Sequence, residues 1–295
     1  MAAIIGYIGV GDMGGPMVRN MMKAGFDVVV YDTQADRLDA LVADGARRGA
    51  SAADVANRAE IVMVCLNTLG AMRSVAAEAA TGSAIRIYVD MSTTGPTPAQ
   101  ELRRIFDGTG IATLDAPVSG HISKAVDGTL TVIASGPRDA FDACRPAFEA
   151  MGENVFYLGD IPGGGQMMKL ANNYVNNVQA VGTCEALTMG IRFGLDPSVM
   201  LDILNVSTGR NSQTEGPLAE AVRTGRFLGG ANMKISQKDI TLAVEEAQRL
   251  GAPTDMGVAA KAAYDNAIAH GGDNERSTAI MKHVAARAGL TIERK

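Results

Sequence analysis

The hydrophobic pattern of the chain changes near Pro162, and this change limits what the chain can fold into. Before Pro162, short apolar runs rich in β-branched residues alternate with segments whose apolar residues recur every three or four positions. The apolar runs cover residues 3–9, 27–32, 60–66, 86–91, 111–115, 130–135 and 155–158. Strands that alternate with helices build βαβ units and a parallel sheet covered on both faces. We therefore expect a doubly wound α/β domain over residues 1–162.

After Pro162 the strand pattern stops. Apolar residues keep helical spacing from Gly163 to Arg192, which predicts one long helix. Asp196-Pro197 then supplies an N-cap residue followed by a proline at the first helical position. The rest of the chain, to Lys295, is typical of further helices separated by glycines. The second domain, residues 163–295, is therefore predicted to be all-helical.

The charge and the cysteines exclude several classes of protein. Lys and Arg number 27 against 32 Asp and Glu, so the net charge of −5 leaves no basic surface for a nucleic acid backbone. No apolar run reaches the roughly 18 residues that span a membrane, and residues 1–10 lack the basic start of a secretion signal. Cys65, Cys144 and Cys184 lie far apart, and neither they nor the three histidines have the spacing of zinc ligands. We expect reduced thiols, no metal, no nucleic acid or membrane partner, and a cytoplasmic protein.

A glycine loop directly follows the first predicted strand. It reads Gly9-Val10-Gly11-Asp12-Met13-Gly14, a G-x-G-x-x-G pattern at the start of a predicted helix. In such a loop the first glycine allows the tight turn, the second lets the backbone approach a pyrophosphate, and the third lets the helix pack closely on the strand. The N-terminus of the helix then faces the phosphate charge. The loop and its context predict a Rossmann-type domain that binds a dinucleotide.

Asp32 ends the second predicted strand, 18 residues beyond Gly14. A carboxylate there accepts hydrogen bonds from the adenosine ribose hydroxyls and repels a 2′-phosphate, so we expect NAD rather than NADP. The less favoured alternative is that Asp32 only caps the next helix. Arg37 could in principle meet a 2′-phosphate, but we interpret it as a solvated arginine on a helix face.

A lysine and an asparagine lie near the start of the long predicted helix. Lys169 and Asn173 are four residues apart and share one helical face. Four asparagines lie within six positions, at 172, 173, 176 and 177, although asparagine is a poor helix former. We interpret them as lining a polar cleft, and a polar contact between the two domains is the alternative.

Oxidation of an alcohol by NAD requires a group that accepts the hydroxyl proton. His270 and His283 fall in distal predicted helices, where surface or core roles are expected. Lys169 can accept the proton if burial or a neighbouring cation lowers its pKa from about 10.4 toward the working pH. In the reverse direction its ammonium would donate the proton.

Three stretches follow one another in a recognisable order. They are Gly6-Tyr7-Ile8-Gly9-Val10-Gly11-Asp12-Met13-Gly14-Gly15-Pro16-Met17, Asp115-Ala116-Pro117-Val118-Ser119-Gly120, and Gly165 with Lys169 and Asn173 at intervals of four. In order and spacing, along nearly the whole chain, they resemble the β-hydroxyacid dehydrogenase family. Its members include 3-hydroxyisobutyrate dehydrogenases and tartronate semialdehyde reductases.

The resemblance implies a role for each matching residue. Lys169 is implied as the catalytic acid/base, Asn173 as a holder of the substrate, and Ser119 with Gly120 as the binder of its carboxylate. A serine hydroxyl and backbone N–H groups in one turn suit a carboxylate. Contacts to the cofactor are implied for Gly9, Val10, Gly11, Asp12, Met13, Gly14, Asp32, Leu66, Thr93 and Lys238, the last closing over the cofactor from the helical domain.

The chain departs from the family at one position of the substrate turn. His121 stands where the family has the second glycine of a Ser-Gly-Gly turn, and Leu66-Asn67 replaces a common Leu-Pro. An imidazole there could narrow the pocket, add a donor, or become cationic near pH 6.5. We expect His121 to select a substrate with an additional polar or anionic group, and a histidine turned to solvent is the alternative.

The leading functional hypothesis is NAD-dependent oxidation of a small 3-hydroxy acid, with Lys169 as the proton acceptor. Physiological reduction of a small aldehyde acid would use the same residues in reverse. Imine reductases are similar but typically lack the lysine, and decarboxylating phosphogluconate-type enzymes need a longer helical domain. A non-catalytic dinucleotide-binding protein would have no reason to keep Lys169, Asn173 and the Ser119-Gly120 turn together. The resemblance also points to a homodimer or homotetramer, with the helical domain as the substrate and oligomerisation domain.

Overall fold

The computed structural model describes residues 4–292, so Ala3 of the first predicted strand and residues 293–295 of the second predicted domain lie outside it. The chain forms two compact units, Met1–Lys169 and Leu170–Lys295. The sequence places a domain boundary near Pro162. The compact units divide after Lys169, because the first turn of the long helix packs with the first unit.

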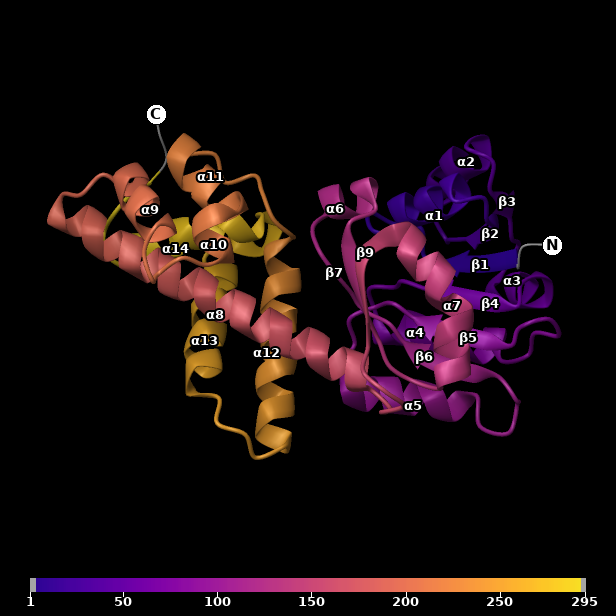
Figure 1. The fold of residues 1–295 in the computed structure, drawn as a ribbon. Coiled ribbons are helices and arrows are strands. Elements are labelled where there is room, and N and C mark those ends of the chain that lie inside the picture. The colour runs from indigo at the N-terminus through magenta and orange to yellow at the C-terminus, as the bar shows by residue number, and fades with distance from the viewer. Residues whose placement is uncertain (1–3, 293–295) are drawn as a thin grey trace. The chain divides into compact units, whose positions relative to one another are not determined.

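A six-stranded parallel sheet forms the centre of the first unit (Figure 1). Its strands are β1 (Ile4–Ile8), β2 (Asp27–Tyr31), β3 (Arg47–Arg48), β4 (Ile61–Val64), β5 (Ile87–Asp90) and β6 (Ala112–Asp115). Their order is β3-β2-β1-β4-β5-β6, and every neighbouring pair is parallel. This order reverses between β1 and β4, and open parallel sheets generally bind their ligands at the carboxyl ends of the strands at such a reversal.

Helices cover both faces of this sheet, and each face has its own apolar core. One core contains side chains of α1 (Gly14–Lys23), α2 (Ala35–Ala43) and α7 (Arg138–Met151). The other contains side chains of α3 (Ala52–Arg58), α4 (Leu69–Ala79) and α5 (Pro96–Ile105). The predicted helix residues Met17, Met21, Leu38 and Leu41 are buried in the first core, as their spacing requires.

Two of the predicted strands do not belong to the parallel sheet. A separate three-stranded sheet contains β7 (Val118–Ser119), β8 (Leu130–Ala134) and β9 (Gly152–Tyr157), in that order. β7 runs antiparallel to β8, whereas β9 is parallel to it. The expectation of a single parallel sheet was therefore wrong for residues 130–135 and 155–158. Strands β3 and β7 were not predicted, because two-residue strands are too short to show a hydrophobic period.

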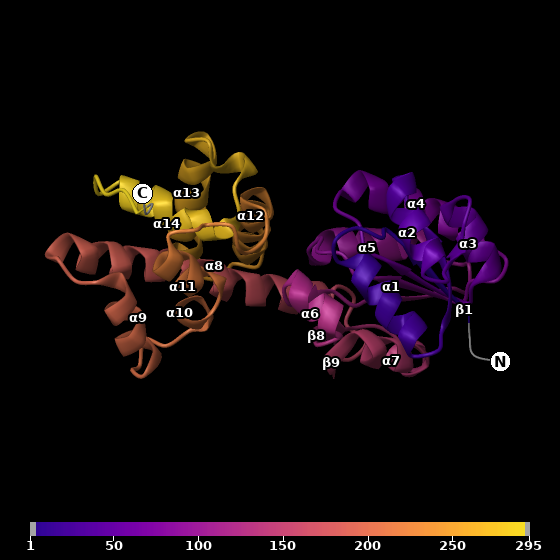
Figure 2. The ribbon, with the colours of Figure 1, turned by 90° about the horizontal axis from the view of Figure 1, so that it is seen from above.

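The second unit consists of helices packed on α8 (Gly164–Phe193), as predicted (Figure 2). The other helices are α9 (Pro197–Asn205), α10 (Ser212–Glu215), α11 (Pro217–Thr224), α12 (Met233–Arg249), α13 (Asp255–Ala269) and α14 (Ile280–Ala286). Their core joins Cys184 and Leu187 of α8 to Ile240, Tyr264 and Met281 of later helices. Asp196 caps α9 by accepting hydrogen bonds from the N–H groups of Ser198 and Val199, at 2.7 and 3.2 Å. Within residues 4–292, no helix combines the length and the apolar character needed to cross a membrane.

Candidate active site

The glycine loop after β1 is shaped by close backbone approaches. Gly9 has a φ of +90°, and a Cβ atom there would lie 2.2 Å from the carbonyl oxygen of Cys65. A Cβ atom on Gly14 would lie 2.1 Å from the carbonyl oxygen of Gly9, so α1 packs directly on the turn. A Cβ atom on Gly11 would meet only the guanidinium of Arg37, at 2.5 Å. On this side, the flexible side chain of Arg37 is the group that lies over the backbone of Gly11.

The carboxylate of Asp32 holds this loop in place. It accepts a hydrogen bond from the N–H of Val10 at 2.8 Å and another from the N–H of Gln34 at 2.9 Å. A carboxylate has about four acceptor positions, so Asp32 keeps acceptor capacity for hydroxyl donors. The residue thus orders the loop and can still receive a ribose.

Arg37 is a partly exposed residue of α2, as expected, and it also lies beside the glycine loop. Its guanidinium lies 3.6 Å from the carboxylate of Asp12, and about 40% of its side chain is accessible. Arg37 can fold onto the loop because Gly11 has no side chain to keep it away. A bare backbone at Gly11, a cation beside it and the Asp32 carboxylate together fit the pyrophosphate and the ribose of a dinucleotide.

The carboxyl ends of β4 and β5 are joined by hydrogen bonds. The N–H of Leu66 donates to Oγ of Ser92 at 2.9 Å, and the N–H of Ser92 donates to Oδ1 of Asp90 at 2.9 Å. Thr93 follows in the same segment and is half-buried. These bonds bring Leu66 and Thr93, the two residues expected along the cofactor, to one edge of the sheet.

Two buried carboxyl groups lie beneath this edge. Asp90 and Asp115 are 5% and 9% exposed, and both line a small cavity that also contains Arg103. Burial raises the pKa of the Asp90 carboxyl. Burial also raises the pKa of Asp115 to about 6, against the lowering effect of hydrogen bonds from backbone N–H groups at the start of α8. Burial thus disfavours the charged form of Asp115, but the hydrogen bonds by which its carboxylate caps α8 partly offset this effect.

The first turn of α8 is locked onto the sheet by Asp115 and Gln166. Asp115 accepts hydrogen bonds from the N–H groups of Gly163 at 3.2 Å and Gln166 at 3.0 Å. The Gln166 side chain is fully buried; its oxygen accepts from the N–H of Thr94 at 2.9 Å, and its nitrogen donates to the carbonyl of Ser92 at 2.8 Å. Helix α8 therefore starts at a fixed place beside the segment that contains Thr93.

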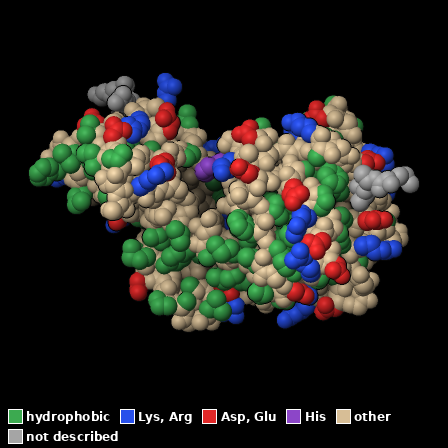
Figure 3. Space-filling model, in the orientation of Figure 1, with side chains coloured by type: hydrophobic (Ala, Val, Ile, Leu, Met, Phe, Trp, Pro, Cys, Tyr) green, Lys and Arg blue, Asp and Glu red, His purple; other side chains and the backbone are tan. Residues whose placement is uncertain are grey.

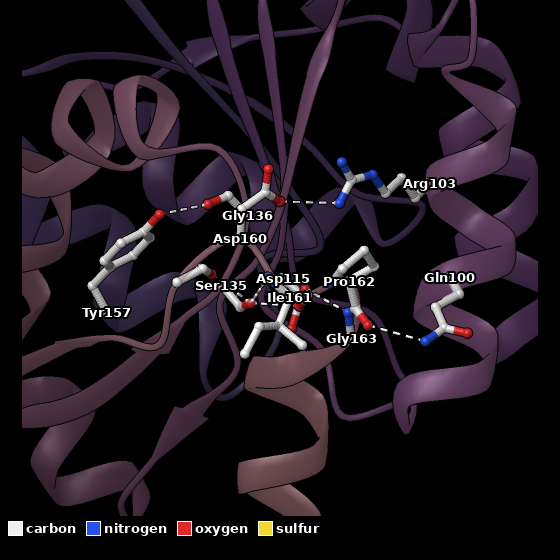
Figure 4. A network of polar contacts seen from close by, with 11 residues as sticks. Gln100, Arg103, Asp115, Ser135, Gly136, Tyr157, Asp160, Ile161, Pro162 and Gly163 are labelled. Carbon is white, nitrogen blue, oxygen red and sulfur yellow. Dashed lines mark hydrogen bonds and ion pairs between the residues drawn. The ribbon is translucent and has the colours of Figure 1, made fainter.

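The chain that leads into α8 is held by its own network (Figure 4). Ser135 Oγ donates to a backbone carbonyl of this segment, and Tyr157 Oη donates to the carbonyl of Gly136 at 2.9 Å. From α5, Gln100 donates to the carbonyl of Pro162 at 3.0 Å, and Arg103 lies 3.3 Å from the Asp160 carboxylate. The approach to α8 is thus fixed from two sides.

Lys169 lies in α8 three residues after Gln166 and is half-buried, and Asn173 follows one turn later. Asn173 donates to Oδ2 of Asp239 on α12 at 2.8 Å, and Asn177 donates to the carbonyl of Asn173 at 2.8 Å. Lys238 lies 3.2 Å from Oδ1 of Asp239. Part of the asparagine cluster therefore links helices inside the second unit, and its role in a cleft stays a prediction.

The predicted substrate turn is more exposed than the first turn of α8. Ser119 is half-buried in β7, whereas Gly120 and residues 121–124 are exposed. Gly120 has a φ of +144°, and a Cβ atom there would lie 3.3 Å from Cδ of Lys124. The aliphatic part of the Lys124 side chain therefore lies close to Gly120. His121 follows Gly120 and precedes α6 (Ile122–Asp127).

Histidines and cysteines elsewhere have ordinary structural roles. His270 Nδ1 lies 2.8 Å from the carbonyl of Asn266, and His283 Nε2 lies 2.6 Å from the Glu275 carboxylate. Cys65, Cys144 and Cys184 form no disulfide. In the described part of the chain, no three His, Cys, Asp or Glu side chains are grouped to hold a metal ion.

Neither the role of Gln166 nor that of Asp115 was predicted from the sequence. One signal was available for Gln166, since a polar residue three positions before Lys169 lies on the same side of the helix. No signal was available for Asp115, because its partners at the start of α8 are about 50 residues away, with sequence separations of 48 and 51.

Comparison with known proteins covers both units. The family described as the NAD binding domain of 6-phosphogluconate dehydrogenase matches residues 4–159. The family described as NAD-binding of NADP-dependent 3-hydroxyisobutyrate dehydrogenase matches residues 163–284.

Individual relatives agree with these matches. The 3-hydroxyisobutyrate dehydrogenase of Pseudomonas aeruginosa is 34% identical over 87% of this chain and 89% of its own length. The 2-(hydroxymethyl)glutarate dehydrogenase of Eubacterium barkeri is 30% identical over 98% of this chain and 97% of its own length. A structure of Mycobacterium tuberculosis 3-hydroxyisobutyrate dehydrogenase with L-serine has a TM-score of 0.84 at 26% identity, over 95% of this chain and 98% of that chain. The chain belongs to the β-hydroxyacid dehydrogenase family of NAD-dependent oxidoreductases.

Proposed function

We propose that the chain oxidises a small 3-hydroxy acid with NAD and that Lys169 exchanges the hydroxyl proton. One observation carries this proposal. The half-buried Lys169 follows directly on the turn of α8 that Gln166 and Asp115 fix beside Thr93, in the unit that also contains the glycine loop. A proton acceptor near the place where a nicotinamide would lie is what alcohol oxidation requires.

The chemistry divides between the cofactor and the protein. When bound, NAD accepts the hydride that leaves the hydroxyl-bearing carbon. Lys169, as a neutral amine, takes the proton from the hydroxyl oxygen, so that the alcohol becomes a carbonyl. Reduction of an aldehyde acid runs the same steps backwards, with the Lys169 ammonium as the donor. Physiological reduction of a small aldehyde acid is therefore the second candidate function, because both directions use the same residues.

The substrate contacts are proposals from the family match. Ser119 and the backbone at Gly120 are suited to hold the substrate carboxylate, and this orients the hydroxyl-bearing carbon. Asn173, whose amide is oriented by Asp239, is proposed to hold the substrate hydroxyl. Contacts with the cofactor are proposed for Gly9, Val10, Gly11, Asp12, Met13, Gly14, Asp32, Leu66, Thr93 and Lys238.

His121 is proposed to favour a substrate with a second polar or anionic group. The exposed imidazole follows the Ser119-Gly120 turn, and the cationic side chain of Lys124 lies on the same turn. The Eubacterium barkeri relative is described as acting on 2-(hydroxymethyl)glutarate, which has two carboxylates. In His121→Gly, kcat/KM for a dicarboxylic 3-hydroxy acid should fall relative to that for 3-hydroxyisobutyrate. An unchanged ratio would contradict this role.

NAD is proposed as the preferred cofactor over NADP. Asp32 would repel the 2′-phosphate of NADP. A cytoplasmic location is proposed because the three cysteines are unpaired. Neither nucleic acid nor a membrane is proposed as a partner.

A homodimer or homotetramer is proposed from exposed apolar side chains on the second unit. Met189 and Phe193 at the end of α8 are 72% and 86% exposed, and Val199, Ile203 and Val206 form a stripe along and beyond α9. Figure 3 shows hydrophobic side chains at the surface of this unit. Sedimentation of the purified protein would distinguish a monomer from these assemblies.

The experiment that tests the proposed function follows nicotinamide absorbance. NAD and then NADP are tried with 3-hydroxyisobutyrate, glycerate, threonate, serine and threonine, using the wild type and Lys169→Ala. We expect turnover with NAD that falls by about 100- to 10,000-fold in the variant. NAD binding without turnover of any hydroxy acid would instead favour a non-catalytic dinucleotide-binding protein.

A further inference from the structure

We infer that Gln166 and Asp115 are positioning residues, which set the first turns of α8 so that the amine of Lys169 is held beside the segment after β5. This inference rests on the proposed function of Lys169. It adds two residues that do not touch the substrate and act through the helix that carries the base.

The Gln166 side chain connects α8 to both sides of Thr93. Its oxygen accepts from the N–H of Thr94 at 2.9 Å and from the N–H of Gly95 at 3.3 Å, and its nitrogen donates to the carbonyl of Ser92 at 2.8 Å. The side chain is 0% exposed, so water cannot replace these bonds easily. A single buried amide therefore ties the helix of the proposed base to the residue expected beside the nicotinamide.

Asp115 fixes the same turn from the neighbouring strand. Its two carboxylate oxygens accept from the N–H groups of Gly163 at 3.2 Å and Gln166 at 3.0 Å. Asp115 ends β6, whereas the partners of Gln166 follow β5. Two anchors on two neighbouring strands restrict both translation of the helix along its axis and rotation about it.

The first turn of α8 is packed so closely on its neighbours that it cannot move nearer to them. A Cβ atom on Gly165 would lie 2.5 Å from the carbonyl oxygen of Ile133, and one on Gly163 would lie 2.9 Å from Cα of Pro96. Lys169 follows Gln166 by three residues and shares its side of the helix. A misplacement of about 1 Å at a reacting group can lower the rate about 100-fold, so small movements of this turn matter.

The test is a double-mutant cycle between Gln166 and Lys169. Gln166→Met keeps the length of the side chain and removes its amide. We expect kcat to fall about 10- to 100-fold while KM for NAD stays within about twofold. In the Lys169→Ala background, Gln166→Met should cause no further loss, because the group that it positions is absent. An equal fold-loss in both backgrounds would overturn the inference.

Two further variants make the outcome unambiguous. Gln100→Met removes an exposed amide that binds the same incoming segment, and it should behave like the wild type. If Gln166→Met does not fold, Asp115→Asn takes its place in the same cycle with the same expectation. Wild-type kcat in Lys169→Ala would refute the proposed function itself, whereas loss there together with an additive effect of Gln166→Met would refute only the positioning role.

Discussion

Two regions of the first unit, the buried network around Asp115 and Gln166 and the turn that begins at Ser119, are built in opposite ways. The Asp115 carboxylate accepts from the backbone N–H of Gln166 and caps α8, and the Gln166 side chain is 0% exposed with both its polar atoms hydrogen-bonded. Four residues after Asp115 begins the turn of Ser119, in which residues 120–124 are exposed. The difference indicates that a buried network sets the position of the proposed base. The proposed substrate turn is exposed, so substitutions there disturb few contacts. We expect rate and substrate preference to depend on different residues.

The largest effect is expected from a methyl group placed inside the buried network. Gly165→Ala would bring a Cβ atom within 2.5 Å of the Ile133 carbonyl oxygen and 2.7 Å of the Asp115 carboxylate. Backbone atoms cannot move aside, so we expect a loss of about 3 kcal/mol or more in the free energy of unfolding, together with loss of activity. Denaturant unfolding measures the change.

Gly182→Ala is the matched control on the same helix. A Cβ atom at Gly182 would meet nothing within 4 Å, and the residue is exposed in α8. Alanine there should stabilise the protein by up to about 1 kcal/mol, since alanine forms helices better than glycine. Equal effects of the two substitutions would contradict the packing described for the first turn.

The next effect concerns the charge of Asp115. Its pKa is about 6 in the folded protein and near 3.8 in the unfolded chain, a difference worth up to about 3 kcal/mol. Between these values the folded protein keeps a proton that the unfolded chain has released, so the wild type loses stability as the pH rises from about 4 to about 6. Asp115→Asn does not titrate. Its free energy of unfolding, compared with that of the wild type, should improve by up to this amount over the same interval.

Measured across pH 4 to 8, a constant difference between Asp115→Asn and the wild type would show that Asp115 does not titrate in this range. Asp90 lines the same cavity, and its negative charge adds to the rise in the pKa of Asp115. The variant should nevertheless lose activity, because an amide nitrogen cannot accept a hydrogen bond from a backbone N–H. Higher relative stability with lower activity would sharpen the distinction between the two regions.

The smallest effect is expected at the exposed turn. Lys124→Met should lower kcat/KM for a dicarboxylic 3-hydroxy acid about two- to fivefold, since exposed charge interactions are weak. The free energy of unfolding and kcat for 3-hydroxyisobutyrate should stay unchanged. Lys23→Met, on the last turn of α1, is the control for loss of an exposed lysine. A drop in kcat for every substrate would contradict this expectation, because it would show that the turn sets the rate, as the buried network does.

The sequence predicted those parts of the fold that have a local signal. Long periodic segments predicted α8 and the main strands, and the spacing of Gly9, Gly11 and Gly14 predicted the loop after β1. The separate sheet of β7, β8 and β9 could not be predicted, because pairing between strands is a long-range property that hydrophobic period does not encode. The site shows the same limit. Lys169 was found from its motif, whereas the bonds of Asp115 and the folding of Arg37 onto Gly11 depend on contacts distant in sequence.

The pH dependence of kcat/KM for hydroxy acid oxidation tests the role of Lys169 most directly. With a base in the protein, the wild-type value should rise with pH and then reach a plateau once that base is deprotonated. Without it, the residual rate of Lys169→Ala should rise about tenfold per pH unit with no plateau, because hydroxide becomes the proton acceptor. A plateau at the same pH in both proteins would contradict the account and assign the proton transfer to another group.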